Sequence, residues 1–209
     1  RQAGALLIIE LDGPAVGIAA QHEIVEACLK ANGAISMQWA GSEAERAKIW
    51  KARKTSFGAL GRIAPHGYVL DGVIPRSRLA EAISGIAAIG KKLNLTIANV
   101  YHAGDGNLHP CMLYHRDNED EVARVMRAGK EILELCVELG GTLSGEHGIG
   151  IEKIAEMSSV FSDQDLQLMG ELKAAFDPLG ILNPGKVLPQ LKACGESRPL
   201  LRHRLMSGC

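Results

Sequence analysis

The fold is decided by residues 96–115, which read TIANVYHAGDGNLHPCMLYH. Two runs rich in apolar residues, 96–102 and 109–115, lie on either side of a turn that contains two glycines. Runs of this composition, separated by so few residues, are typical of β-strands joined as a hairpin. Because a short link joins only strands that run in opposite directions, we expect an antiparallel pair here.

A long amphipathic helix is predicted directly after this hairpin. Asn118 with Glu121 three residues later forms an N-terminal cap, and Gly140-Gly141 ends the helix. Between these signals, apolar residues recur at helical spacing along one face: Val122, Val125, Met126, Leu133, Cys136 and Leu139. Such a face indicates a helix that packs against the rest of the domain.

Strand and helix patterns alternate along the rest of the chain. Apolar runs at 6–11, 34–39 and 67–74 predict strands. Helical spacing or capping residues predict helices at 15–31, from Ser42 through Arg53, at 77–93, near Glu152 and at 163–176. Interleaved strands and helices around a hairpin indicate the α+β class: a mainly antiparallel sheet covered by helices, with a helical C-terminal segment.

Charge, hydropathy and cysteine content exclude several classes of protein. The 209 residues include 23 basic and 24 acidic side chains, so the chain has no basic footprint for nucleic acid. No apolar run reaches the roughly 20 residues that cross a bilayer, and the first residues lack the order of a signal peptide. The 5 cysteines form no Cys-x-x-Cys pair, which argues against a disulfide framework or a thiolate zinc site. We therefore expect a cytoplasmic globular protein.

The stretch HAGDGNLHP, residues 102–110, places His102 and His109 on either side of a glycine-rich turn. Such a turn can bring the two imidazoles together. Two neutral imidazoles and one carboxylate, with an open position, form an ordinary site for zinc or another divalent ion. A carboxylate must then come from elsewhere in the chain.

The stretch SGEHGIG, residues 144–150, supplies Glu146 and His147 between glycines, just after a predicted helix end. Both can reach back toward the first loop. The plainer interpretation is that His102 and His109 are hydrogen-bonded strand-end histidines and that Glu146 is a solvated acid. Each residue alone favours that interpretation. The combination in two glycine-rich loops favours a site, since function concentrates on loops held by a scaffold.

A third stretch, FDPLGILNPGK at 176–186, is a run of turn residues with apolar anchors. Its residue types alone fit a packed C-terminal loop as well as a functional one. Together with HAGDGNLHP and SGEHGIGIEK, however, it resembles the signature segments of the C-terminal domain of FAD-linked oxidases of the vanillyl-alcohol oxidase superfamily. This family includes glycolate oxidase D subunits and D-lactate dehydrogenases, and the resemblance covers about residues 6–189.

The resemblance implies the substrate (cap) domain of a flavin-dependent enzyme that oxidises a small 2-hydroxy acid, glycolate or D-lactate, to the 2-oxo acid by hydride transfer to FAD. It implies that His102, His109 and Glu146 hold a divalent metal, zinc or manganese, which grips the substrate. His147 would then take the hydroxyl proton. A neutral imidazole next to a cation is a reasonable base near neutral pH.

The resemblance implies four further contacts. Asn107 would hydrogen-bond the substrate, and Asn183 and Lys186 would face the flavin. Arg53 is similar to the arginine that binds the substrate carboxylate, although an exposed helix charge explains it equally well. Some relatives carry a lysine where this chain has Val69, so a monocarboxylate fits better than a dicarboxylate.

The predicted organisation is one C-terminal domain at 1–189 and a tail at 190–209. No dinucleotide-binding glycine fingerprint precedes residue 100, so we expect the N-terminal FAD-binding domain to be absent from this chain and the chain alone to be inactive. The expected partners are that FAD-binding domain, the 2-hydroxy acid and other oxidase subunits, including an iron-sulfur subunit. Attachment to the inner membrane through those subunits and self-association through an exposed apolar face are further expectations.

Two other functions are compatible with the residues. The first is a free-standing metal-binding or subunit-docking module that needs no flavin. The second is a metal-dependent hydrolase in which Glu146 or Asp105 activates a zinc-bound water.

Overall fold

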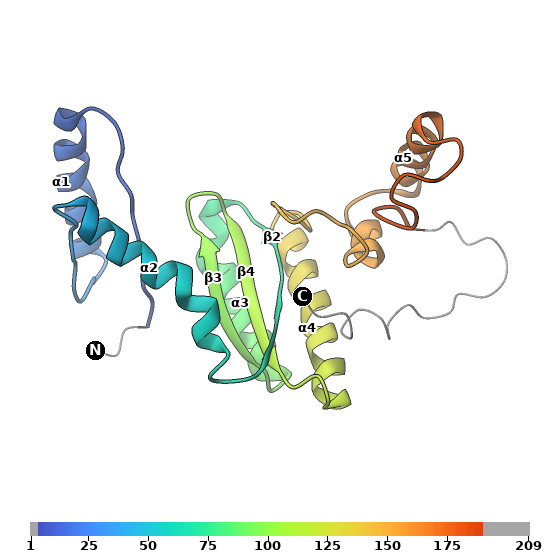
Figure 1. Ribbon diagram of the computed structural model, residues 1–209, viewed down its shortest axis with the longest axis horizontal. Coiled ribbons are helices and arrows are strands. Elements are labelled where there is room, and N and C mark those ends of the chain that lie inside the picture. The colour runs from blue at the N-terminus through green and yellow to red at the C-terminus, as the bar shows by residue number, and fades with distance from the viewer. Residues whose placement is uncertain (1–3, 190–209) are drawn as a thin grey trace. The chain divides into compact units, whose positions relative to one another are not determined.

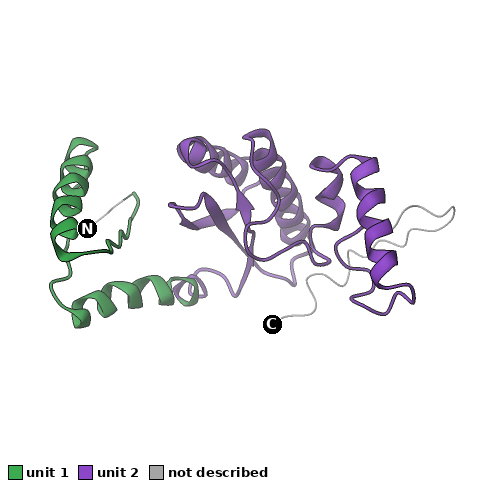
Figure 2. Cartoon of the chain, turned by 90° about the horizontal axis from the view of Figure 1, so that it is seen from above, with its two compact units in different colours: residues 1–58 green, residues 59–209 purple. Residues whose placement is uncertain are grey.

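The computed structural model describes residues 4–189, and Figure 1 shows the order of their helices and strands. The chain divides into two compact units, residues 1–58 and residues 59–209 (Figure 2). The predicted tail at 190–209 lies outside the described residues. No helix in the described part is long and apolar enough to cross a membrane.

The first unit consists of two helices and their connecting segments. α1 spans Ala15–Ala31, as predicted, and α2 spans Glu43–Leu60, so its last residues lead into the second unit. The amide of Glu45 donates to the hydroxyl of Ser42 over 3.3 Å, which confirms the predicted start of α2. Neither helix contains a buried residue.

The strands predicted at 6–11 and 34–39 are wrong, because neither segment has strand geometry. A strand is stable only when a neighbour pairs with its backbone and one face is covered. No described strand pairs with either segment. Their apolar side chains are instead exposed, Leu6 to 83% and Ile35 to 70%.

A small antiparallel sheet forms the centre of the second unit (Figure 1). Its central strand is β4, Asn107–Tyr114, and every residue of this strand is buried. β3, Thr96–His102, pairs with β4 along its whole length and places His102 opposite Asn107. The predicted hairpin and its antiparallel direction are therefore confirmed.

The other edge of β4 is occupied by β1, His66–Val69, and β2, Gly72–Val73. The register with β4 is the same on both sides of the gap, so β1 and β2 are two parts of the strand predicted at 67–74. The ladder is interrupted next to Pro110, because proline has no N–H to donate. The carbonyl of Pro110 still accepts from the amide of Leu70 over 3.1 Å.

Two helices cover one face of this sheet. α3 spans Leu79–Lys92, after a 3-10 turn at Arg76–Arg78, and α4 spans Glu119–Glu138. The amide of Glu121 donates to the Asn118 side chain over 3.2 Å, as the predicted cap requires. Helix and sheet side chains form one core, which includes Ala82, Ile86, Leu108, Met112, Val125, Ile132, Leu133 and Cys136. The α+β class is thereby confirmed.

The site residues of β4 lie on the sheet face away from this core. Leu108 and Met112 point into the core. Because side chains alternate along a strand, Asn107 and His109 point to the opposite face. The register of β1 and β2 places Asp71 opposite His109, on the same face.

The C-terminal part of the described chain is helical, as predicted. A 3-10 helix spans Ile154–Ser159, and α5 spans Asp163–Phe176. Ser162 and Asp165 form a capping box at the start of α5, in which each side chain accepts from the other residue's amide.

The loop after α5 is anchored by Asp177, which is nearly buried. Its carboxylate accepts from the amides of Ile181 at 2.9 Å and Leu182 at 3.0 Å, and from the Lys173 ammonium at 2.8 Å. The Lys173 contact, together with the two amides, holds the pKa of Asp177 below its usual range. Around this anchor the apolar side chains are exposed: Leu168, Leu172, Phe176, Leu179, Ile181 and Leu182, which we call the C-terminal apolar face.

Candidate metal and substrate site

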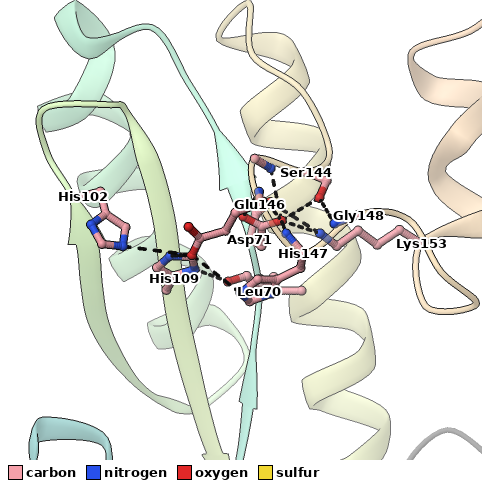
Figure 3. A network of polar contacts seen from close by, with 10 residues as sticks. Leu70, Asp71, His102, His109, Ser144, Glu146, His147, Gly148 and Lys153 are labelled. Carbon is pink, nitrogen blue, oxygen red and sulfur yellow. Dashed lines mark hydrogen bonds and ion pairs between the residues drawn. The ribbon is translucent and has the colours of Figure 1, made fainter. Parts of the chain in front are cut away.

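The two predicted histidine loops meet at one carboxylate oxygen (Figure 3). Oε1 of Glu146 lies 2.9 Å from Nε2 of His109, 4.0 Å from Nε2 of His102 and 3.8 Å from Nε2 of His147. His102 comes from the end of β3, His109 from β4, and the other two from the loop after α4. Residues that are 44 positions apart in sequence, His102 and Glu146, thus share one cluster.

His109 is the buried member of the cluster, and its orientation is set by a backbone contact. Its Nδ1 lies 3.1 Å from the carbonyl oxygen of Leu70. A carbonyl only accepts, so Nδ1 carries a proton, and the other ring nitrogen, Nε2, faces Glu146. The rings of His102 and His147 lie 5.4 Å and 5.2 Å from the His109 ring, the first edge-on and the second stacked.

This geometry fits a cation. A lone pair on Nε2 of His109 and a carboxylate oxygen of Glu146, 2.9 Å apart, repel each other unless a proton or a cation lies with them. Imidazole nitrogen and carboxylate oxygen are the donor set that zinc and other first-row divalent ions accept. Ligand-type atoms of Asp71, His109, Glu146 and His147 also lie within 4.8 Å of one another.

Asp71 organises the loop that carries Glu146 and His147, although sequence reasoning did not identify it. Its carboxylate accepts from the Ser144 hydroxyl at 2.6 Å and from the amides of Gly145 at 3.1 Å, Glu146 at 3.1 Å and His147 at 2.8 Å. Five donors, counting the ammonium of Lys153 at 3.2 Å, surround this one side chain. All five contact Oδ2, and only the Glu146 amide also reaches Oδ1, so most of the acceptor capacity of Asp71 is used to hold this loop.

The charge on Asp71 is stabilised by those donors against burial. Asp71 is 0% exposed and the side chain of Lys153 is 2% exposed. Burial by itself raises the pKa of Asp71, but the Ser144 hydroxyl, the amides of His147 and Glu146 and the Lys153 ammonium outweigh it and hold this pKa far below its usual range.

One signal in the sequence could have revealed Asp71. A carboxylate in the apolar run GYVLDGVI requires a buried partner.

Asn107 lies in the same cluster, at the start of β4. It is 6% exposed, and its Oδ1 has no hydrogen-bond partner among the described residues. The Gly145 backbone packs so closely that a Cβ added there would lie 2.9 Å from Oδ1. A buried polar atom without a partner is uncommon, and it suits a site that a ligand completes.

Three other predicted site residues lie in other elements. Arg53 belongs to α2 in the first unit, where its guanidinium carbon is 6.0 Å from the ring centre of Phe57. Asn183 and Lys186 lie in the loop after α5, and both are exposed. The amide of Lys186 donates to the carbonyl of Asn183 over 3.3 Å, which forms a turn with Asn183 at a φ of 47°. The roles of these three residues stay predictions.

Comparison with known proteins supplies the family. The sequence model of "FAD linked oxidases, C-terminal domain" matches residues 1–187. The "Glycolate oxidase subunit GlcD" of Escherichia coli strain K12 is 46% identical over 194 residues, which cover 93% of this chain and 39% of that protein. The protein of the same name from Bacillus subtilis strain 168 is 41% identical, over 88% of this chain and 39% of its own length.

A more distant relative is the "Probable D-lactate dehydrogenase, mitochondrial" of Danio rerio, 33% identical over 87% of this chain and 37% of that protein. The chain therefore spans about two fifths of the length of these relatives, or slightly less. Because one family model accounts for residues 1–187, across both compact units, this chain belongs to the FAD linked oxidases and represents their C-terminal domain.

Proposed function

We propose that this chain is the substrate side of an FAD-dependent enzyme that oxidises a small 2-hydroxy acid, glycolate or D-lactate, to the 2-oxo acid. The observation that carries this proposal is the convergence of three imidazoles on one oxygen of Glu146. The substrate class comes from the names of the relatives, a glycolate oxidase subunit and a D-lactate dehydrogenase.

His102, His109 and Glu146 are the proposed ligands of a divalent cation, zinc or manganese. The lone pair of Nε2 on His109 is available because Nδ1 donates to the Leu70 carbonyl. The Glu146 side chain is 53% exposed, so a ligand from solvent can reach it. When bound, the cation would polarise the substrate hydroxyl and balance the substrate carboxylate.

His147 is the proposed base. Its ring is about half-exposed and makes no hydrogen bond to the described residues, so a ring nitrogen is available to take the hydroxyl proton. Loss of that proton and of a hydride from the adjacent carbon converts the 2-hydroxy acid into the 2-oxo acid. FAD, when bound, supplies the acceptor for the hydride. Asn107 has an unpaired buried oxygen that can accept a hydrogen bond from the substrate.

The remaining contacts are proposed from the family resemblance and from exposure. Arg53 would bind the substrate carboxylate, and Asn183 and Lys186, both exposed, would contact the flavin. The C-terminal apolar face would contact the FAD-binding domain, since exposed apolar patches of this kind mark interaction surfaces. Without that domain the same face favours self-association.

Partner subunits are proposed because two of the relatives are named as subunits. An iron-sulfur subunit as the electron acceptor, a cytoplasmic location and attachment to the inner membrane through such subunits stay predictions. The hydrolase alternative has no support from the relatives, which are named as a glycolate oxidase subunit and a D-lactate dehydrogenase.

One variant and one matched control test the metal assignment. Zinc or manganese titrated into the 209-residue chain should bind the wild type, and His109→Ala should lose most of that affinity. His115→Ala is the matched control, because His115 pairs with Glu121 and lies outside the cluster. Equal affinity in all three proteins would refute the metal assignment.

The chemical step is tested in a chimera in which this chain replaces the matching part of Escherichia coli GlcD. With glycolate or D-lactate under anaerobic conditions, the chimera should reduce its flavin. His147→Gln should slow that reduction by about 10²- to 10⁴-fold while the bound metal is retained. A rate equal to that of the parent chimera would remove His147 from the mechanism.

A further inference from the structure

We propose that Asp71 is a positioning residue, which turns both Glu146 and His147 toward His109 without itself binding the cation. For what the cluster binds, this inference rests on the proposed function. For how the cluster is built, it rests only on the contacts of the described residues.

The first step of the argument is that two adjacent side chains reach the same histidine. Oε1 of Glu146 lies 2.9 Å from Nε2 of His109, and the His147 ring stacks on the His109 ring at 5.2 Å. In an extended chain, successive side chains point to opposite sides. Glu146 and His147 can therefore share a target only if the backbone bends between them.

The bend is centred on the Asp71 carboxylate. The consecutive amides of residues 145, 146 and 147 all donate to it, at distances of 2.8 to 3.2 Å. The Ser144 hydroxyl donates to Asp71 at 2.6 Å and accepts from the amide of Gly148 at 2.7 Å, which closes the turn at both ends. A single acceptor for successive amides thus fixes the direction in which each side chain leaves the loop.

The second step is that the same dipeptide orients His109. The carbonyl of Leu70 accepts from Nδ1 of His109, while the next residue, Asp71, holds the opposite loop (Figure 3). Leu70 and Asp71 lie in the gap between β1 and β2, next to Pro110. At this interruption, one dipeptide therefore contacts both parts of the site. Leu70 orients His109, and Asp71 holds the loop that carries Glu146 and His147.

The third step is that Asp71 contributes no net charge to the site. The Lys153 ammonium lies 3.2 Å from its carboxylate, and both side chains are almost fully buried. The pair is neutral as a whole, so Glu146 supplies the negative charge that faces the three imidazoles. Because Lys153 already neutralises Asp71, the charge of a bound cation would be balanced by its own ligands, such as Glu146.

The test uses the 209-residue chain and two variants. Asp71→Asn removes the charge and most of the acceptor capacity, but it leaves the buried Lys153 ammonium unpaired. The double variant Asp71→Asn/Lys153→Met removes both charges, a replacement that buried ion pairs often tolerate. Asp177→Asn is the matched control, because Asp177 also gathers amides but lies in the loop after α5.

In the double variant, amide hydrogens of residues 145–147 should exchange faster with solvent than in the wild type. Those of β3 and β4 should keep their protection. Zinc affinity should fall about 10- to 100-fold, the range found when a group that orients a metal ligand is removed. At saturating Co²⁺, the visible spectrum should still match that of the wild type, since the ligands are unchanged. Asp177→Asn should alter neither affinity nor spectrum.

Three results would overturn the proposal. Unchanged amide exchange at residues 145–147 would show that Asp71 does not hold the loop. Faster exchange with unchanged zinc affinity would show that the loop geometry does not affect cation binding. A Co²⁺ spectrum of lower coordination, with affinity as weak as in His109→Ala, would make Asp71 a ligand. If the wild type binds no cation, the proposed function fails, and the exchange data alone then decide whether Asp71 positions the loop.

Discussion

Two buried aspartates, Asp71 and Asp177, each hold a loop by accepting hydrogen bonds from it, but their lysine partners differ in burial. Each carboxylate accepts from backbone amides further along the chain and from one lysine. Asp71 gathers amides 74 to 76 residues away, and its lysine side chain is 2% exposed. Asp177 gathers amides 4 and 5 residues away, and its lysine side chain is 36% exposed.

This comparison shows how burial of the lysine partner changes the contribution of an otherwise similar ion pair to stability. Around Asp177, water can replace Lys173, so the anchor organises a local turn. Around Asp71, both side chains are buried away from bulk water, so the loss of either partner leaves an uncompensated charge in the interior. We therefore expect the Asp71 cluster to be essential to the second unit and the Asp177 cluster to be dispensable for it.

The largest expected effect comes from removing each lysine. Lys153→Met should destabilise the second unit by about 3–5 kcal/mol, because the Asp71 charge stays buried without its partner. Lys173→Met should cost a small fraction of that, since water can solvate Asp177 in its place. Urea unfolding followed by tyrosine circular dichroism reports the second unit selectively, because this unit holds every tyrosine and the first unit holds both tryptophans. Equal losses for the two variants would break the comparison.

A smaller effect is expected from one glycine in each loop. A Cβ at Gly145 would lie 2.7 Å from the Val73 side chain, so Gly145→Ala should cost about 1–3 kcal/mol through overpacking. Gly180 has a φ of +64° and open space around it, so Gly180→Ala should cost roughly 1–2 kcal/mol through backbone strain alone.

The two alanine variants should differ more clearly in zinc binding than in stability. Gly145→Ala moves the loop that carries Glu146 and should weaken zinc affinity, whereas Gly180→Ala should leave it unchanged. Calorimetric titration of both variants makes this measurement. Weaker zinc binding in Gly180→Ala than in Gly145→Ala would contradict the assignment of the site to the first loop.

The smallest expected effect is a response of the Asp177 loop to acid. The pKa of Asp177 is lowered in the folded chain, first by Lys173, so the stabilisation is complete above the unfolded pKa of about 3.9 and is lost as the pH falls through the folded value. The amide resonances of Ile181 and Leu182 should shift over that acid range. In Asp177→Asn this titration should disappear, and persistence of the shift would assign it to another group.

Sequence reasoning succeeded where the determining signals are local. The bounds of α1, β3 and α5 follow from apolar spacing, glycine turns and capping residues within a few positions of each element. The meeting of His102, His109 and Glu146 was foreseen because glycine-rich loops bracket each of them. The predicted strands at 6–11 and 34–39 failed because a strand depends on a partner that the segment itself does not reveal.

The missed part of the site depends on long-range pairing. Lys153 and Asp71 are 82 residues apart, and no sequence pattern around either residue indicates that they pair. The aspartate does interrupt an apolar strand, which marks it as unusual, but its partner can only be read from the structure. A single sequence therefore reveals candidate metal ligands more readily than the residues that orient them.

The central position of β4 has a consequence for the order of folding. Its pairing with β3 closes a loop of only a few residues, whereas its pairing with β1 joins segments more than 40 residues apart. Short loops close at a lower entropic cost, and local contacts form earlier in folding. The hairpin that carries His102 and His109 is thus able to form before the edge strand arrives with Leu70 and Asp71. We therefore expect the histidine pair to be assembled early in folding and Asp71, which completes the site, to join it in a later step.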